Sequence, residues 1–451
     1  MSFHRSVLRC ALMNERISVI GTGYLGATHA ACMAELGFEV LGVDADAHKV
    51  AMLAEGVVPF AEPGLDEMVA RHVREGRLRF TTSLAEAAEF ADVHFVCVGT
   101  PQSRDGLCAD LTAVFSVVEG LAPLLRHDSL VVGKSTVPTG TAARLAERVT
   151  TLASPGVVVE LAWNPEFLRE GHAIEDTLRP DRLVLGVASA EAEKTLRHLY
   201  RQPIREGVPV AVTDVRTAEL SKLAANAFLA TKISFINAMA EMSDLAGADI
   251  VALQDVLGYD DRIGRRCLNA GLGFGGGCLP KDIRALTAQA AELGADTAGT
   301  LLSAVDATNA RMRARVIEMA VEACDGDPSS RRVAVLGAAF KPLSDDVRDS
   351  PALHVASALH AQGAHVRVFD PAATDNARRV APMLDYAGSA REALTGADLV
   401  LHLTEWPQFR ALDPMEMAAL VGRRRIIDGR HGLDPDRWRL AGWSYRALGR
   451  A

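Results

Sequence analysis

The chain has 451 residues, 49% of them hydrophobic and 23% charged, which is enough for two or three domains with sizeable cores. Its 48 Lys and Arg against 57 Asp and Glu give a formal charge of −9, which argues against nucleic acid or an anionic membrane as the partner. No long apolar run indicates a membrane span. The seven cysteines are scattered without CxxC spacing, so neither a disulfide framework nor a metal site is expected, and a reduced cytoplasmic location is the simplest expectation.

Residues 1–14 precede the first expected strand. They carry basic residues but no long apolar region and no clear cleavage site, so a signal peptide is not expected. We interpret them as an N-terminal extension, either functional or the product of an upstream start.

A glycine-rich turn follows the first strand. The β-branched segment from residue 15 runs into GxGxxG at Gly21, Gly23 and Gly26, and a small-residue helix is expected from about residue 27 to 36. The second strand, 38–44, ends in Asp44, 18 residues past the last glycine. This order predicts a dinucleotide site, with Asp44 on a ribose diol and therefore NAD rather than NADP. Lys49 is a mild counter-signal, or it bridges the ribose.

The strand and helix alternation continues. Strands are expected at 92–98 and 129–135, with Thr100 and Thr136 just beyond their carboxyl ends. Ligands bind at such strand ends, so both hydroxyls are candidate cofactor neighbours, although ordinary turn chemistry explains them equally well. The loop at 163–171, WNPEFLREG, then places three charged side chains around two apolar ones.

One long apolar helix is expected from about residue 214 to 245. Its polar residues Glu219, Lys222 and Asn226 share one face, and we interpret them as a buried stripe that faces a site. Asn237 and Glu241 form a second polar pair suited to a helix or subunit contact.

Three glycines, 275–277, lead directly into Cys278 at an expected helix start. Lys281 and Asp282 follow within one turn. A thiol beside a helix N-terminus and a lysine has reasons to ionise, which favours a nucleophile, whereas a cysteine is more often a packing residue. These residues alone leave the two readings about even.

The C-terminal part repeats the rhythm of the N-terminal half. A helix at about 300–324 and a polar turn at 325–332 precede strands at 332–337, 365–369, 397–404 and 425–429, without a GxGxxG. We therefore predict an α/β protein with two Rossmann-like doubly wound domains joined by a long central helix. The expected domains are an NAD-binding domain at 15–210, a central helical domain with the cysteine loop at 211–324, and a second nucleotide-binding domain at 325–451.

Eight blocks in this order match a known family. The chain resembles the nucleotide-sugar 6-dehydrogenases, and most closely the UDP-glucose 6-dehydrogenases, through GTGYLG (21–26), VGTP (98–101), STVPTGT (135–141), NPEFLREG (164–171), ELSKLAANAFLATKISFIN (219–237), GLGFGGGCLPKD (271–282), AFKPLSDDVRDSP (339–351) and DGR (428–430).

The resemblance implies an NAD-dependent four-electron oxidation of UDP-glucose to UDP-glucuronate. Cys278 would be the nucleophile that forms a thiohemiacetal and then a thioester. Lys222 and Asn226 would stabilise the oxyanion, and Asp282 and Thr136 would position a water. Glu166 would be an acid/base group, although the identity of the general base stays open. No metal is implied.

The resemblance also implies the binding residues. Cofactor contacts would be Gly21, Gly23, Tyr24, Gly26, Asp44, Lys49, Thr100, Thr136, Glu170, Lys281 and Arg348. Substrate contacts would be Glu166, Phe167, Leu168, Arg169, Lys222, Asn226, Arg262, Gly275, Lys341 and Arg430, with Arg262 reaching a neighbouring subunit. Lys341 and Arg430 would meet the diphosphate. A homodimer or higher homo-oligomer through the central helix is expected.

One position departs from the family pattern, and three other functions remain open. The family usually has Ser where this chain has Gly277, and we expect a modest effect. GDP-mannose 6-dehydrogenase is the closest rival, UDP-N-acetylmannosamine dehydrogenase is a weaker one, and a non-catalytic nucleotide-sugar binder is the alternative from another class.

Overall fold

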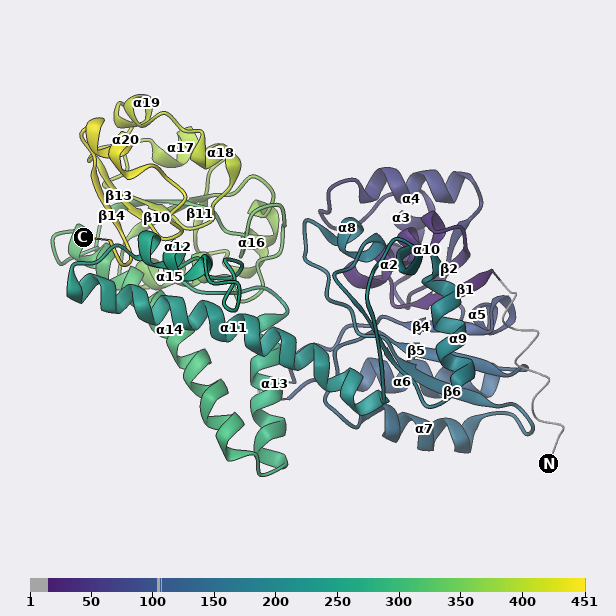
Figure 1. The fold of residues 1–451 in the computed structure, drawn as a ribbon. Helices are drawn as coiled ribbons and strands as arrows, with labels where there is room; N and C mark the ends of the chain where they lie inside the picture. Colours follow the sequence, from purple (N-terminus) through teal and green to yellow (C-terminus); the bar gives the residue numbers. More distant parts are fainter. Residues whose placement is uncertain (1–14, 104–105, 107, 451) are drawn as a thin grey trace. The chain divides into compact units, whose positions relative to one another are not determined.

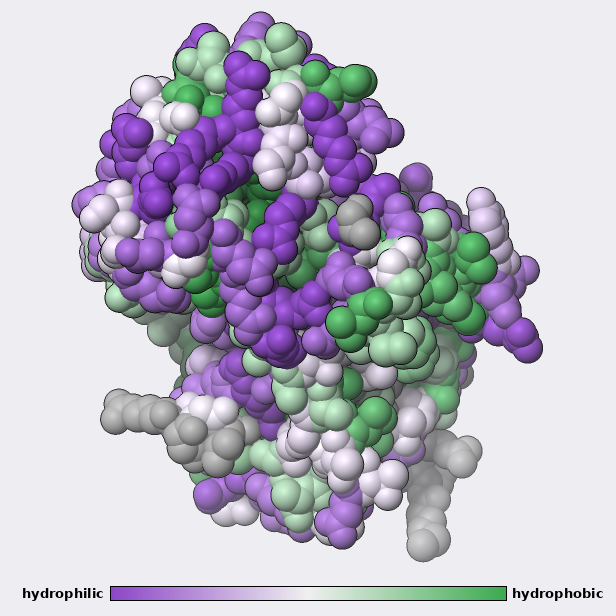
Figure 2. Space-filling model, turned by 90° about the vertical axis from the view of Figure 1, so that its left-hand side faces the viewer, coloured by the Kyte–Doolittle hydropathy of each residue, from purple (hydrophilic) through white to green (hydrophobic). Residues whose placement is uncertain are grey.

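The computed structural model describes residues 15–103, 106 and 108–450, so the predicted N-terminal extension lies outside the described residues. The chain divides after Ala225 into two compact units, each built around its own sheet (Figure 1). The face of the molecule in Figure 2 is mostly hydrophilic, with apolar residues in separate groups.

The first unit is built on an eight-stranded sheet in the order β3-β2-β1-β4-β5-β6-β7-β8. Every neighbouring pair is parallel except β6 and β7, which pair antiparallel at Trp163 and Gly186. The strands are β1 (Arg16–Ile20), β2 (Glu39–Val43), β3 (Leu78–Thr81), β4 (Val93–Val96), β5 (Ser129–Gly133), β6 (Val159–Trp163), β7 (Leu183–Gly186) and β8 (Val210–Thr213).

Both faces of this sheet are buried, because successive side chains of each strand point to opposite faces and both sets are apolar. In β5, Leu130 and Val132 join one hydrophobic cluster and Val131 joins another. The helices that supply the rest of these clusters are α2 (Tyr24–Glu35), α3 (Ala47–Ala54), α4 (Leu65–Arg74), α5 (Leu84–Phe90), α6 (Thr112–Leu121), η1 (Ala122–Leu124), α7 (Thr141–Leu152), α8 (Ala173–Leu178), α9 (Ala190–Leu199) and α10 (Arg201–Arg205).

The long helix α11 (Val215–Ala246) runs through the division between the two units, close to its predicted limits. Among the described residues it alone has the length and apolar composition to cross a membrane, and 44% of its most apolar window is buried in the fold. A buried core helix meets the same criteria. The buried Glu219, Lys222 and Asn226 lie within it, as the predicted polar stripe requires.

The second unit begins with helices and ends with a parallel six-stranded sheet in the order β11-β10-β9-β12-β13-β14. This order repeats that of the first six strands of the first unit. Its strands are β9 (Arg332–Leu336), β10 (His365–Phe369), β11 (Asp385–Tyr386), β12 (Leu399–His402), β13 (Arg425–Asp428) and β14 (Ser444–Ala447). Its helices after α11 are α12 (Ile250–Gly258), α13 (Leu279–Glu292), α14 (Asp296–Ala323), α15 (Pro351–Ala361), α16 (Thr374–Val380), α17 (Ala390–Leu394), α18 (Pro407–Arg410), α19 (Pro414–Ala418) and α20 (Pro435–Leu440).

Two doubly wound sheets and a long helix confirm the predicted fold class. The second sheet has its own aspartate at the position that corresponds to Asp44. Asp370, at the end of β10, is 2% exposed and accepts N–H groups from Ala338, Ala339 and Trp406. Its carboxylate therefore holds the loop after β9.

Candidate active site

The turn after β1 needs its glycines for three different reasons. Gly21 has φ +91°, and a Cβ there would overlap Val98. A Cβ at Gly26 would overlap the carbonyl oxygen of Gly21, so the third glycine allows the helix to pack onto the turn. A Cβ at Gly23 would meet nothing within 4 Å, so its surface is left open for the close approach of a pyrophosphate.

Asp44 lies at the carboxyl end of β2, beside this turn. Its carboxylate accepts N–H groups from Thr22 at 2.8 Å and Asp46 at 3.0 Å, and Lys49 Nζ lies 2.9 Å away. Burial favours the neutral carboxyl, but these hydrogen bonds and the lysine outweigh it, so the pKa of Asp44 lies below its ordinary value. An ionised acid beside an open glycine turn fits the ribose and pyrophosphate of NAD.

Glu62 is a functional candidate that sequence reasoning missed. It is 6% exposed and accepts N–H groups from Gly171 at 2.6 Å and Ala173 at 2.7 Å, and it also accepts the hydroxyl of Tyr24. The predicted cofactor residue Tyr24 is thereby tied to the end of the NPEFLREG loop, which also carries Glu170. An acid in the turn sequence AEPGL gave no signal, because its amide partners lie more than 100 residues away.

Thr100 and Thr136 lie close together at the ends of β4 and β5. The Thr100 hydroxyl donates to the Thr136 carbonyl oxygen at 2.8 Å, and Thr100 is buried. This bond fixes two neighbouring strand ends. A hydrogen bond within a turn is the ordinary explanation that we weighed for these two threonines. A cofactor role for either threonine stays a prediction.

The NPEFLREG loop brings Glu166 to the long helix. Glu166 Oε1 lies 3.2 Å from Lys222 Nζ, and Oε2 accepts the N–H of Leu168 at 2.7 Å. The ammonium of Lys222 also lies 5.5 Å from the centre of the Phe167 ring. Arg169 is exposed and pairs with Asp176 at 2.7 Å.

Glu219 shares the buried face of Lys222 but has another partner. Its carboxylate accepts N–H groups from Gly140 at 2.6 Å and Ala142 at 2.7 Å, at the start of α7. Burial raises the pKa of Glu219, and the two amide hydrogen bonds only partly offset that rise. The stripe is buried as predicted, and Glu219 anchors the start of α7; that the stripe faces a site stays a prediction.

The second polar pair of α11 also has partners inside its own unit. Asn237 Oδ1 accepts the N–H of Gly271 at 2.9 Å, and Glu241 pairs with Arg315 at 3.1 Å. Glu241 therefore joins α11 to helix α14, one of the two alternatives that the sequence offered, whereas Asn237 holds the loop that leads to Cys278.

In the second unit, Cys278 is exposed at the N-terminus of α13. Asp282, with 1% of its side chain exposed, lies one turn along, and its N–H donates to the Cys278 carbonyl at 3.0 Å. Its carboxylate accepts Asn226 Nδ2 and Lys281 Nζ, each at 2.6 Å. Four predicted site residues thus meet in one charged and hydrogen-bonded cluster.

The glycines before Cys278 are enclosed to different degrees. A Cβ at Gly275 would overlap the backbone carbonyl of Asp349, whereas a Cβ at Gly277 would overlap only the guanidinium of Arg348. The Arg348 side chain is 64% exposed and pairs with Asp346 at 2.6 Å. A side chain at position 277 would therefore meet the end of a long, largely exposed side chain.

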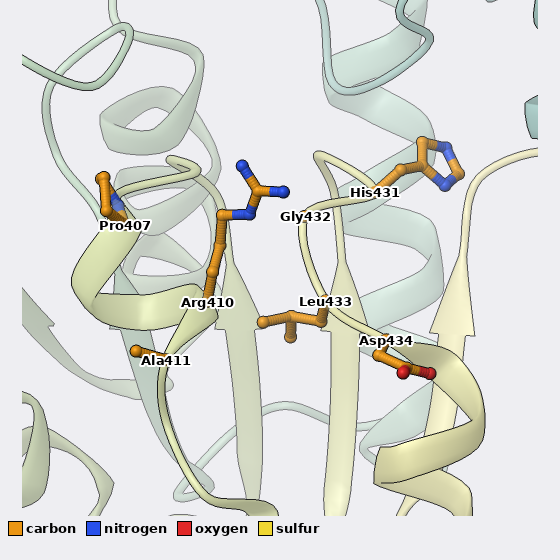
Figure 3. A pocket seen from close by; sticks show the side chains of 7 residues that line it. All are labelled: Pro407, Arg410, Ala411, His431, Gly432, Leu433 and Asp434. Atoms are coloured by element: carbon orange, nitrogen blue, oxygen red, sulfur yellow. The ribbon is translucent and has the colours of Figure 1, made fainter.

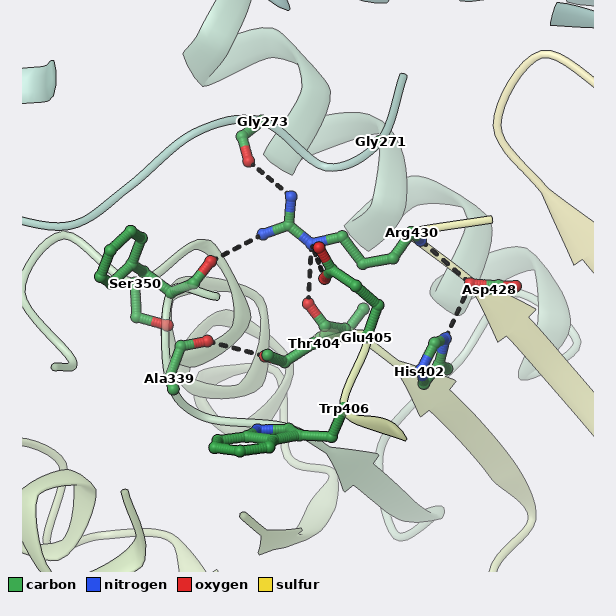
Figure 4. Close-up of polar contacts among 12 residues, drawn as sticks. Gly271, Gly273, Ala339, Ser350, His402, Thr404, Glu405, Trp406, Asp428 and Arg430 are labelled. Atoms are coloured by element: carbon green, nitrogen blue, oxygen red, sulfur yellow. Dashed lines mark hydrogen bonds and ion pairs between the residues drawn. The ribbon is translucent and has the colours of Figure 1, made fainter. Parts of the chain in front are cut away.

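The predicted diphosphate residue Arg430 ties three backbone segments together (Figure 4). Its guanidinium donates to the carbonyl oxygens of Leu403 at 3.0 Å, Gly273 at 2.9 Å and Phe340 at 3.3 Å, and only 14% of the side chain is exposed. Lys341 lies over the Phe340 ring, with its Nζ 5.5 Å from the ring centre.

Arg262 behaves differently, since 89% of its side chain is exposed and it pairs with Asp260 at 2.6 Å. Substrate roles for Arg262, Lys341 and Arg430 stay predictions.

A separate hollow of about 630 Å³ lies beyond β12 and β13 (Figure 3). It contains none of the predicted site residues. Its lining is Pro407, Arg410, Ala411, His431, Gly432, Leu433 and Asp434.

Three family models match the chain in sequence order. They describe the NAD binding domain (residues 15–204), the central domain (216–311) and the UDP binding domain (334–435) of the UDP-glucose/GDP-mannose dehydrogenase family. Two relatives are UDP-glucose 6-dehydrogenases: that of Pseudomonas aeruginosa is 42% identical over 448 residues, covering 96% of this chain and 97% of the relative, and that of Rhizobium meliloti is 40% identical over 437 residues, covering 96% and 99%. The solved UDP-glucose dehydrogenase of Pyrobaculum islandicum aligns with a TM-score of 0.89 and 38% identity over 97% of this chain and 98% of that one.

The fold, the glycine turn and Asp44 define an oxidoreductase that uses NAD. The chain belongs to the UDP-glucose/GDP-mannose dehydrogenase family. The predicted resemblance and the predicted cofactor are both confirmed.

Proposed function

We propose that this enzyme oxidises UDP-glucose at C6, in two steps on one sugar, to UDP-glucuronate. The observation that carries the proposal is the cluster at the start of α13, where an exposed cysteine lies beside a buried carboxylate that already binds an amide and an ammonium. The UDP-glucose 6-dehydrogenase relatives and the family's UDP binding domain support the substrate.

NAD, when bound, accepts the hydride that C6 loses in each of the two oxidations. In the first, the C6 alcohol loses a hydride and a proton and becomes an aldehyde. The thiolate of Cys278 adds to the aldehyde carbon, which forms a C–S bond and leaves a hemithioacetal oxygen. Loss of a second hydride from the same carbon gives a thioester, so the reactive aldehyde need not leave the protein.

The remaining steps are assigned to four polar side chains by their chemistry. The ammonium of Lys222 and the amide of Asn226, one turn apart on α11, are the donors we assign to the developing oxyanion. Asp282 is the group we assign to hold the water that attacks the thioester; cleavage of the C–S bond then returns the thiolate and releases the carboxylate. Glu166, already paired with Lys222, is a second acid/base candidate.

The experiment is to count NADH formed per nucleotide sugar consumed, with UDP-glucose and GDP-mannose in parallel. We expect two NADH per UDP-glucose and little turnover of GDP-mannose. One NADH per sugar would mean that the aldehyde escapes, and the role of Cys278 would be withdrawn. Turnover of GDP-mannose alone would reassign the substrate.

We further propose that the enzyme is a homodimer, or a higher homo-oligomer, that pairs through α11. Phe228, Phe235 and Met242 are 66%, 51% and 58% exposed. They recur every seven residues, so they form one stripe along the helix. Exposed aromatic and methionine side chains aligned in this way suit a second copy of the same surface.

A further inference from the structure

The loop that leads to Cys278 is held by a buried amide on helix α14. Asn309 is 2% exposed; its Oδ1 accepts the N–H of Phe274 at 2.8 Å, and its Nδ2 donates to the carbonyl of Phe274 at 3.0 Å. One side chain therefore satisfies both backbone groups of one loop residue. The fit requires Gly273, because a Cβ there would overlap Asn309 Oδ1.

Further contacts hold the same segment. Arg313, one turn along α14, also donates to the Phe274 carbonyl at 3.0 Å. Asn237 of α11 accepts the N–H of Gly271 at 2.9 Å, and Arg430 donates to the carbonyl of Gly273, as Figure 4 shows. The Phe274 ring packs in a small cluster with residues of α11, α13 and α14.

Between Phe274 and Cys278 lie only glycines; Gly276 has φ +85°, and its N–H donates to the Arg348 carbonyl at 2.9 Å. The direction of the thiol therefore depends on three fixed points, Phe274, the Gly276 N–H and the first turn of α13, and Phe274 is the one that a side chain of α14 holds from both of its backbone groups. We propose that Asn309 is a positioning residue, which sets the geometry of the Cys278 thiol by clamping Phe274. Its catalytic consequence rests on the proposed function, but its effect on the thiol does not.

The test uses the full-length enzyme and two variants. Asn309→Asp keeps the size and the Oδ1 acceptor but turns the donor into an acceptor that faces the Phe274 carbonyl. Asn309→Ala removes both bonds. A misplaced reacting group costs on the order of tenfold to a hundredfold in rate. We expect turnover of UDP-glucose to fall in that range with little change in KM, and the yield to fall from two NADH per sugar toward one.

A readout without substrate is the rate at which iodoacetamide alkylates Cys278, followed by mass spectrometry of its peptide. We expect this rate to change at least about threefold in both variants. Should Asn309→Ala fail to fold, the conservative Asp variant carries the test.

The matched control is Ser234→Ala. Ser234 is 4% exposed and donates to the Val305 carbonyl at 2.9 Å, so it also joins α11 to α14, but it makes no bond to the cysteine loop. We expect a lower melting temperature with unchanged alkylation and unchanged NADH yield.

Asn309 variants that melt earlier but keep the wild-type alkylation rate and two NADH per sugar would overturn the proposal. A wild-type enzyme inactive on UDP-glucose would instead refute the proposed function, and the alkylation rates would still decide the role of Asn309.

Discussion

At the scale of single residues, the proposed chemistry rests on Cys278 and its neighbours. Cys278 and Asp282 differ in exposure: Cys278 is exposed, whereas the carboxylate of Asp282 is buried and binds an amide and an ammonium. A group that must form and break a covalent bond needs access, and a group that orients water needs to be held still.

The Cys278→Ser variant should lose net uronate formation, because a hydroxyl at this position is a far weaker nucleophile and a far poorer leaving group than a thiolate. We expect a loss of at least about a thousandfold in uronate formed, with UDP-glucose binding kept. Mass-spectrometric detection of UDP-glucuronate checks this. Wild-type output from the variant would contradict the nucleophile assignment.

Two glycines of the cysteine loop give a matched pair of substitutions. Gly275→Ala would force a Cβ onto the Asp349 carbonyl and Pro351, neither of which can move without the backbone, and should cost about 2–3 kcal/mol. Gly277→Ala should cost under about 1 kcal/mol, since only the exposed Arg348 guanidinium must shift. Melting temperatures measure both; equal losses would contradict the difference in their surroundings.

Lys134 is a buried cation whose charge lowers the free energy of unfolding of the first unit. It is 6% exposed, and its Nζ donates to Asn164 Oδ1 at 2.9 Å. Burial lowers its pKa to about 8 from the ordinary 10.5. Between pH 8 and pH 10.5 the unfolded chain therefore binds more protons than the folded protein. Below pH 8 the buried charge lowers the free energy of unfolding by its full amount, and this loss shrinks as the pH rises to 10.5.

Lys134→Met should remove that dependence. Its stability relative to wild type should fall as pH rises from 8 to 10.5, by on the order of 3 kcal/mol over the whole window. Burial raises the pKa of the neighbouring Cys97 to about 12 in the folded protein, and its titration in the unfolded chain is common to both proteins and cancels in the difference. Denaturant unfolding of both proteins across that range checks the expectation, which a pH-independent difference would contradict.

At the scale of elements, helix α11 has two faces of different composition and exposure. One face carries the buried polar residues Glu219, Lys222 and Asn226. The other face carries the exposed stripe of Phe228, Phe235 and Met242. An isolated helix with apolar residues on most sides is stable only where both faces find partners.

Phe235→Glu should therefore shift the assembled enzyme toward monomers, because a charge in the centre of an apolar contact is left desolvated and unpaired. Light scattering after size-exclusion chromatography measures the mass. Leu440→Glu, at an 88% exposed leucine of α20, is the control and should leave the mass unchanged. A wild type that is already monomeric would end the proposal of pairing through α11.

At the scale of the whole molecule, the two units carry different nucleotide-binding features. The glycine turn and Asp44 belong to the first unit, and the match to the UDP binding domain lies in the second. The same strand order recurs in both units, and in each sheet an aspartate after the second strand, Asp44 or Asp370, accepts N–H groups from the loop after the first strand.

Asp44→Asn should weaken NAD binding about tenfold to a hundredfold, because an amide loses the charge-assisted acceptor for the ribose hydroxyls. UDP binding should stay within about twofold of wild type, since no UDP-binding-domain residue is changed. Calorimetric titration of the two ligands separates these effects. Unchanged NAD affinity would remove Asp44 from the ribose role.

The sequence by itself determined the two doubly wound domains, the long helix, the dinucleotide turn and the segment that holds Cys278. Those features are local, because each depends only on residues that are close in sequence. Examples are the strand periodicity, the GxGxxG spacing and the glycines before a helix start. Only the tertiary structure decided the partners of buried polar groups. Glu62, Glu219 and Asn309 each bind backbone groups at least 35 residues away in the chain, and no local pattern records such a contact.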